Sequence, residues 1–115
     1  MRKLFIILLG IIAGTSLSQI NGQDKTVVFT TSAGVIKARL YNDVPNHTKT
    51  FINKAVKGDY NGALFTRVIK EFMIQGGSPD SKNAPAGARC GFGDRNSEIL
   101  PELRDRYFHK KGALA

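Results

Sequence analysis

A cationic side chain, two large apolar side chains and a primary amide lie within nine residues of one another in this chain. They are Arg67, Phe72, Met73 and Gln75. The residues around them predict two short strands joined by a tight connection at residues 70–71. Such a hairpin can place all four groups at the mouth of one shallow groove. We therefore expect a site that binds an extended peptide and acts on its backbone without a nucleophile.

Each of these residues also has a purely structural interpretation. Arg67 lies between apolar residues on one face of its predicted strand, and an unpaired cation is costly to bury. It must therefore reach the rim of the sheet, meet a carboxylate or bind a ligand. Phe72 and Met73, taken singly, could belong to the hydrophobic core. Gln75 is harder to explain in this way because two glycines follow it, and glycine lets two backbones approach closely.

Other kinds of catalytic site are not supported by the sequence. His47 and His109 have no Cys, Asp or Glu cluster at ligand spacing, so we expect structural or surface roles for both. The patterns of serine hydrolases, zinc peptidases and phosphate-binding loops are missing. The single Cys90 can form neither an intrachain disulfide nor a multi-cysteine metal site, which leaves a plain loop thiol or an intermolecular bridge. We expect no cofactor and no metal ion.

The elements that must position the site are mainly strands. Strands are predicted at residues 26–31, 35–40, 63–69 and 72–76. Gly34 marks the turn between the first two. In the second strand, apolar residues alternate with polar ones, so that strand should have one face in water. Its apolar face consists of Ile36, Ala38 and Leu40.

One helix is predicted between the two pairs of strands. Asn46 can cap its start, and Gly58 ends it after Lys57. Its apolar stripe consists of Phe51, Ile52, Ala55 and Val56. After the last strand, residues 78–97 are rich in glycine and proline and predict a loop, and loops of this length are usually functional or mobile. A short helical turn is expected within residues 100–108.

The first 22 residues have the pattern of a secretory signal peptide. A charged start precedes an apolar run over residues 4–13, and small residues at 16 and 18 offer a cleavage site, with cleavage near Gly22 as an alternative. The run is shorter than the roughly twenty apolar residues of a membrane span, although an uncleaved N-terminal anchor is an alternative interpretation. We therefore expect a periplasmic or secreted protein without a stable membrane span after cleavage.

The net charge of +8 is spread along the chain rather than gathered in one run. Binding to nucleic acid requires positive charge concentrated on one face, so we interpret these residues as a solvated surface and expect no nucleic-acid partner.

The segment Phe65-x-Arg67-Val68-Ile69-x-x-Phe72-Met73-Ile74-Gln75-Gly76-Gly77 resembles the signature of the cyclophilins, the peptidyl-prolyl cis–trans isomerases. The likeness extends over the whole exported part. The first hairpin is similar to the first two strands of the family, residues 44–51 to the start of its first helix, and residues 108–115 to bacterial members just before a central strand.

The resemblance implies a mainly β fold, a closed antiparallel β-barrel of roughly eight strands with capping helices. It implies that proline-containing polypeptides are the substrates and that rotation about X–Pro bonds is the reaction. By the same resemblance Arg67 is the catalytic arginine, and Phe72 and Met73 form walls of the proline pocket. Gln75 is the amide that holds the substrate backbone.

The resemblance further implies several strands after the position of Ala115. We therefore expect residues 23–115 to be the incomplete N-terminal portion of a cyclophilin domain, as a fragment of a longer protein. Two local differences from the family are Ser78, where an acidic residue is usual, and residues 94–96, which replace glycines.

The leading hypothesis is an exported, monomeric prolyl isomerase that assists the folding of exported proteins. One alternative is a non-catalytic module that binds proline-containing peptides. Another is an inactive truncated product without a stable fold.

Overall fold

A computed structural model of the 115-residue chain describes residues 3–7, 23–93 and 98–115. The predicted cleavage sites lie outside these residues, as do most of the predicted signal peptide and the replaced glycines at 94–96.

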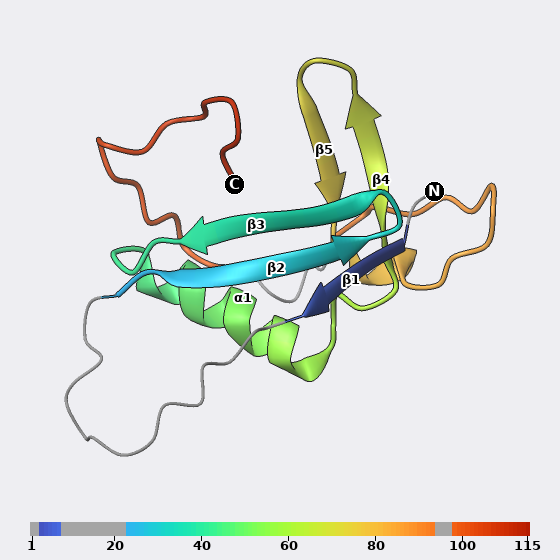
Figure 1. Ribbon diagram of the computed structural model, residues 1–115, viewed down its shortest axis with the longest axis horizontal. Helices are drawn as coiled ribbons and strands as arrows, with labels where there is room; N and C mark the ends of the chain where they lie inside the picture. The colour runs from blue at the N-terminus through green and yellow to red at the C-terminus, as the bar shows by residue number, and fades with distance from the viewer. Residues whose placement is uncertain (1–2, 8–22, 94–97) are drawn as a thin grey trace.

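Five strands form the sheet in the order β3-β2-β1-β4-β5, and all neighbouring strands are antiparallel (Figure 1). Their bounds are β1 Lys3–Ile7, β2 Lys25–Thr31, β3 Gly34–Leu40, β4 Ala63–Ile69 and β5 Met73–Gly76. Two helical segments accompany them, α1 at Pro45–Lys57 and the 3-10 turn η1 at Pro79–Ser81. Within the described residues the strands do not close into a barrel, in agreement with the expected incomplete cyclophilin fold.

Strand β1 is formed by residues that the sequence assigns to the start of a signal peptide. Its backbone pairs with β2 from Leu4 opposite Thr31 to Ile7 opposite Val28, and with β4 at Lys3 opposite Leu64. The segment thus joins the β2–β3 hairpin to the β4–β5 hairpin. The signal peptide itself stays a prediction.

The core lies between the β2–β3 hairpin and α1, which covers one face of that hairpin (Figure 1). Residues two apart on a strand share a face, and Val27 and Phe29 accordingly point together into the core. Leu40 and Ala55 complete the buried cluster, with partly buried neighbours around it. Ile36, on the apolar face predicted for β3, does not pack into the core, because 42% of its surface is exposed.

Helix α1 confirms most of the prediction but corrects it at two positions. The N-cap is Val44 rather than Asn46, which lies inside the first turn. Val56 is 67% exposed and does not belong to the buried stripe, so its assignment to that stripe is wrong. Gly58 ends the helix with φ of 79°, a left-handed conformation that glycine adopts without a Cβ clash.

The helix start is capped from a distant part of the chain. Val44 makes no side-chain capping hydrogen bond, and the first turn has no acidic residue. Instead the Glu102 carboxylate accepts the backbone N–H groups of Asn46, at 3.2 Å, and His47, at 2.8 Å. It also contacts Nδ1 of the His47 ring at 2.6 Å, which gives this histidine a structural role. The carboxylate thus satisfies two N–H groups that have no partner within the helix.

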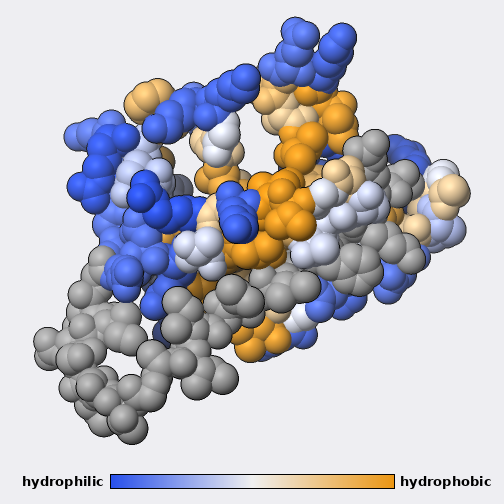
Figure 2. Space-filling model, viewed as in Figure 1, coloured by the Kyte–Doolittle hydropathy of each residue, from blue (hydrophilic) through white to orange (hydrophobic). Residues whose placement is uncertain are grey.

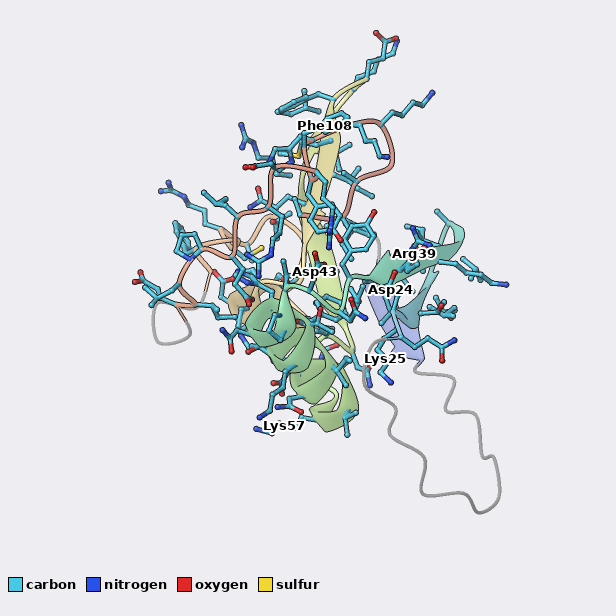
Figure 3. All side chains as sticks on the ribbon, turned by 90° about the vertical axis from the view of Figure 1, so that its left-hand side faces the viewer. Asp24, Lys25, Arg39, Asp43, Lys57 and Phe108 are labelled. Carbon is cyan, nitrogen blue, oxygen red and sulfur yellow. The ribbon has the colours of Figure 1, made fainter. Side chains whose placement is uncertain are left out.

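In the C-terminal segment, residues 98–115, the backbone forms two hydrogen-bonded turns, in which Tyr107 donates its N–H to the carbonyl of Arg104 and Ala113 donates to that of Lys110. The first lies within residues 100–108, where a short helical turn is expected, but it is an isolated turn and not a helix. Asp43 holds this segment beside the helix start (Figure 3). Its carboxylate accepts the Tyr107 hydroxyl at 2.7 Å and pairs with Arg106, while its backbone carbonyl accepts a hydrogen bond from Arg104 at 2.6 Å. The Tyr107 ring stacks on Tyr41 at 4.2 Å.

Candidate functional site

The four residues that the sequence singles out lie on the β4–β5 hairpin. Arg67 on β4 is directly opposite Gln75 on β5, and Ile69 is directly opposite Met73. Directly opposed residues on antiparallel strands project to the same face, and so do residues two apart on one strand. The guanidinium, the amide and the Met73 thioether therefore belong to one face of the hairpin. The opposite face carries Val68 and Ile74, which are also paired.

The hairpin stands away from the rest of the sheet, and most of its side chains are exposed (Figure 1). Figure 2 shows hydrophobic residues along it beneath a hydrophilic tip. Phe72 is 77% exposed and Met73 is half-buried, so the core interpretation does not hold for Phe72. Arg67 and Gln75 are both exposed.

The Arg67 guanidinium has no hydrogen bond or ion pair among the residues that the structure describes, although its backbone pairs with Gln75. Of the three options for this cation, pairing with a carboxylate is therefore not realised within that part of the chain. An exposed guanidinium keeps its hydration and five hydrogen-bond donors for a ligand.

The tip of the hairpin is a tight turn, as the sequence predicts. The N–H of Phe72 donates to the carbonyl of Ile69 at 3.1 Å, and Lys70 and Glu71 form the corner. Glu71 has a positive φ of 61°, which is uncommon for a residue other than glycine. Phe72 belongs to this turn, and β5 begins at Met73 rather than at Phe72, a correction to the predicted strand.

The paired glycines permit a close approach, as expected. A Cβ atom at Gly76 would lie 2.8 Å from the Phe65 ring and 3.2 Å from the Leu64 carbonyl oxygen. Such distances are too short for a side chain, so only glycine fits next to Gln75. Gly77 has φ of 91° and directs the chain away from β5 toward η1.

A polar tether next to the hairpin was not predicted from the sequence. The Asp80 carboxylate accepts the N–H of Gly91 at 3.0 Å and that of Phe92 at 3.2 Å. Ser78 donates its hydroxyl to Asp80 and accepts the N–H of Gly93 at 3.0 Å. The hydrogen bond from Ser78, followed by that from Gly91, holds the pKa of the Asp80 carboxyl below its ordinary value. A carboxylate eleven residues before a glycine carries no periodic signal that could have revealed this contact.

The described residues contain no group of three or more His, Cys, Asp or Glu side chains arranged to hold a metal ion. No helix in this described part is long and apolar enough to cross a membrane.

Comparison with known proteins shows a family match for the part of the chain that contains this hairpin. The family model described as cyclophilin type peptidyl-prolyl cis-trans isomerase/CLD matches residues 26–115. The chain is 40% identical over 94 residues to peptidyl-prolyl cis-trans isomerase-like 1 of Mus musculus, covering 81% of this chain and 54% of the relative. It is 42% identical over 83 residues to peptidyl-prolyl cis-trans isomerase cypE of Dictyostelium discoideum, covering 70% and 52% respectively. No solved structure matches.

The chain belongs to the cyclophilin-type peptidyl-prolyl cis–trans isomerase family. It spans about half the length of the curated relatives that it matches.

Proposed function

We propose that the protein catalyses cis–trans rotation about X–Pro bonds of polypeptides. The observation that carries this proposal is the direct pairing of Arg67 with Gln75 on an exposed hairpin, within a match to the isomerase family over residues 26–115. The family gives the reaction class, and the pairing places a cation and an amide side by side, where both can contact one bound peptide.

The chemistry requires neither a nucleophile nor a proton carrier. Rotation of an X–Pro bond has a barrier of about 20 kcal/mol because the amide is stabilised by resonance. When the bond twists, this resonance is lost and the prolyl nitrogen becomes pyramidal. No covalent bond forms or breaks, so catalysis consists of contacts that are stronger in the twisted state than in the planar one.

Arg67 is the residue proposed to make such contacts. In the twisted state the prolyl nitrogen gains a lone pair that can accept a hydrogen bond, and a guanidinium can donate to it and to the neighbouring carbonyl oxygen. The exposure of Arg67, with no carboxylate bound to it in the described chain, is consistent with this role.

The neighbouring side chains are proposed to hold the substrate. Phe72 and Met73 contact the prolyl ring, and Gln75 forms hydrogen bonds with the backbone that precedes it. Gln75 suits this role because its amide carries both donors and an acceptor directly across the hairpin from Arg67.

The cellular setting is proposed on the sequence alone. Residues 1–22 act as a signal peptide, the protein is periplasmic or secreted, and it assists the folding of exported proteins as a monomer. The charged start and the apolar run after it support this assignment.

A second candidate is a non-catalytic module that binds proline-containing peptides. The placement of all the proposed binding residues on one exposed hairpin favours it, because holding a peptide does not require contacts that are stronger in the twisted state.

Titration of an X–Pro tetrapeptide with the 115-residue protein separates the two candidates. NMR measures the binding constant from chemical-shift changes and the cis–trans rate from exchange peaks in the same sample. An isomerase binds the peptide and raises the exchange rate. Binding without faster exchange would support the module, and the absence of both would contradict both proposals.

A further inference from the structure

The loop at residues 91–93 lies against the strand that carries Arg67. A Cβ atom built on Gly91 would be 2.9 Å from Oγ1 and 3.1 Å from Cβ of Thr66. Gly91 also has φ of 97°, a conformation that residues with side chains rarely adopt. The loop backbone therefore contacts Thr66 at a position where any side chain would be strained.

Thr66 lies at an irregularity in the hairpin. Phe65 pairs with Gly76 and Arg67 pairs with Gln75, so two steps along β4 correspond to one step along β5. Thr66 is thus the extra residue of a β-bulge. A bulge bends its strand and changes the direction of the side chains next to it. The direction of Arg67 therefore depends on how this bulge is held.

Asp80 fixes the loop in this place. Both oxygens of its carboxylate lie 3.0 Å from the Gly91 nitrogen, and one of them also accepts the Phe92 N–H. The η1 segment that carries Asp80 is itself anchored, because the buried Ser81 accepts the backbone N–H of Leu64 at 3.1 Å. Leu64 belongs to β4, so Asp80 is connected to the strand of Arg67 in two ways. One connection runs through Ser81 to Leu64, and the other runs through Gly91 to Thr66.

We propose that Asp80 is a positioning residue for Arg67, acting through Gly91 and the bulge at Thr66. This proposal rests on the proposed function, because that function assigns the catalytic role to Arg67. Asp80 is exposed and lies outside the hydrophobic core, so its substitution should leave the chain folded while it changes the direction of the guanidinium. A small displacement of a catalytic group can cost roughly a hundredfold in rate even when the change is made elsewhere.

The test uses Asp80→Asn, which keeps the shape of the side chain but replaces one accepting oxygen by an NH2 group. The Gly91 and Phe92 N–H groups then compete for a single acceptor. We expect kcat for an X–Pro peptide to fall roughly ten- to a hundredfold while KM changes by less than about twofold. Asp105→Asn is the matched control, since Asp105 is also exposed and lies in the C-terminal segment.

A double-mutant cycle tests whether Asp80 acts through Gly91. Gly91→Ala places a methyl group against Thr66 and should lower kcat by a similar factor. If both residues act through the same contact, the double variant is no slower than the slower single variant, because the contact is already lost. An unchanged kcat in Asp80→Asn, or strictly multiplicative effects of the two changes, would overturn the proposal.

The NMR signal of the Arg67 side-chain Nε–Hε group provides a readout that does not depend on catalysis. It should shift in Asp80→Asn and stay in place in Asp105→Asn. If the wild-type protein does not accelerate exchange, the proposed function fails, but this signal still tests whether Asp80 positions Arg67. A shift would support that role of Asp80, whereas an unchanged signal would refute it.

Discussion

Arg67 and the residues around it show how exposed side chains can be held in defined places without burial. A guanidinium in the core would need a partner, because removing its hydration is costly. On the β4–β5 hairpin it stays hydrated, and its position is set by backbone pairing with β5. The same is true of Gln75. The site residues contribute little to the core, so their substitution should affect function more than stability.

Phe72→Ala tests this separation of function from stability. Because 77% of Phe72 is exposed, the free energy of unfolding should change by about 0.5 kcal/mol or less. Phe29→Ala is the comparison, since Phe29 is 8% exposed and its loss should cost about 3–5 kcal/mol. Urea unfolding followed by circular dichroism measures both values.

Peptide titration of the Phe72→Ala protein gives the second half of the comparison. We expect weaker binding of an X–Pro peptide, because the proposed contact with the prolyl ring is lost. A variant that binds as tightly as the wild type would remove Phe72 from the proposed site.

At the scale of elements, α1 depends on a carboxylate that lies 55 residues after its first turn. Burial would raise the pKa of the Glu102 carboxyl, but hydrogen bonds from the His47 side chain and from the backbone at His47 and Asn46 outweigh it. The net effect keeps the pKa below its ordinary value. The ionised carboxylate is therefore the form that binds the helix start, where negative charge is also favoured by the helix dipole.

Glu102→Gln should loosen the start of α1. The neutral amide is a weaker acceptor for two N–H groups, so amide hydrogen exchange should become faster at Asn46 and His47 and change less in the middle of the helix. Glu98→Gln, at an exposed position in the same segment, serves as the control. Equal protection of Asn46 and His47 in all three proteins would show that Glu102 is not the cap.

The elements that the sequence predicted are those with local signals. The strand of residues 63–69 and the turn at 70–71 follow from β-rich residues and a polar corner, and the structure has them at the same positions. Gly58 as the end of α1 is also a local signal. The Arg67–Gln75 pairing follows from a short hairpin, in which the turn sets the register.

The contacts that the sequence did not predict connect residues far apart in the chain. Glu102 replaces a local cap at Asn46, Asp43 binds Tyr107, and Asp80 binds the loop at Gly91. Pattern and propensity do not report which distant carboxylate reaches a given backbone N–H. The pairing of β1 with β2 and β4 was missed for a different reason, since an apolar N-terminal run is also what a signal peptide requires.

At the scale of the whole molecule, three carboxylates connect segments that are not neighbours in the sequence. The pKa of Asp43 is lowered, chiefly by the hydrogen bond from Tyr107, and the pKa values of Asp80 and Glu102 are lowered as well. Elsewhere on the surface, Asp24 pairs with Arg39 at 3.4 Å (Figure 3). The C-terminal segment and the 91–93 loop are therefore held largely by ionised groups.

These lowered pKa values predict a protein that loses stability in acid. A carboxyl whose pKa is lower in the folded state contributes stability that is present above its unfolded pKa, about 4, and that is lost as the pH falls through the folded value. Urea midpoints should therefore be level from pH 7 to about pH 5 and then decrease toward pH 3. A variant with Asp43→Asn, Asp80→Asn and Glu102→Gln should start lower at pH 7 and decrease less. Parallel pH curves for the two proteins would contradict this assignment.

We propose above all that the Arg67 guanidinium accelerates rotation of the X–Pro bond. The most direct measurement is the cis–trans exchange rate of an X–Pro tetrapeptide, by NMR exchange spectroscopy, with wild-type, Arg67→Ala and Lys37→Ala proteins at equal concentration. Lys37 is an exposed cation on β3 and controls for loss of charge. If Arg67 acts in this way, Arg67→Ala lowers the catalysed rate by roughly a hundredfold or more while Lys37→Ala leaves it unchanged. A folded Arg67→Ala protein that catalyses exchange at the wild-type rate would contradict it.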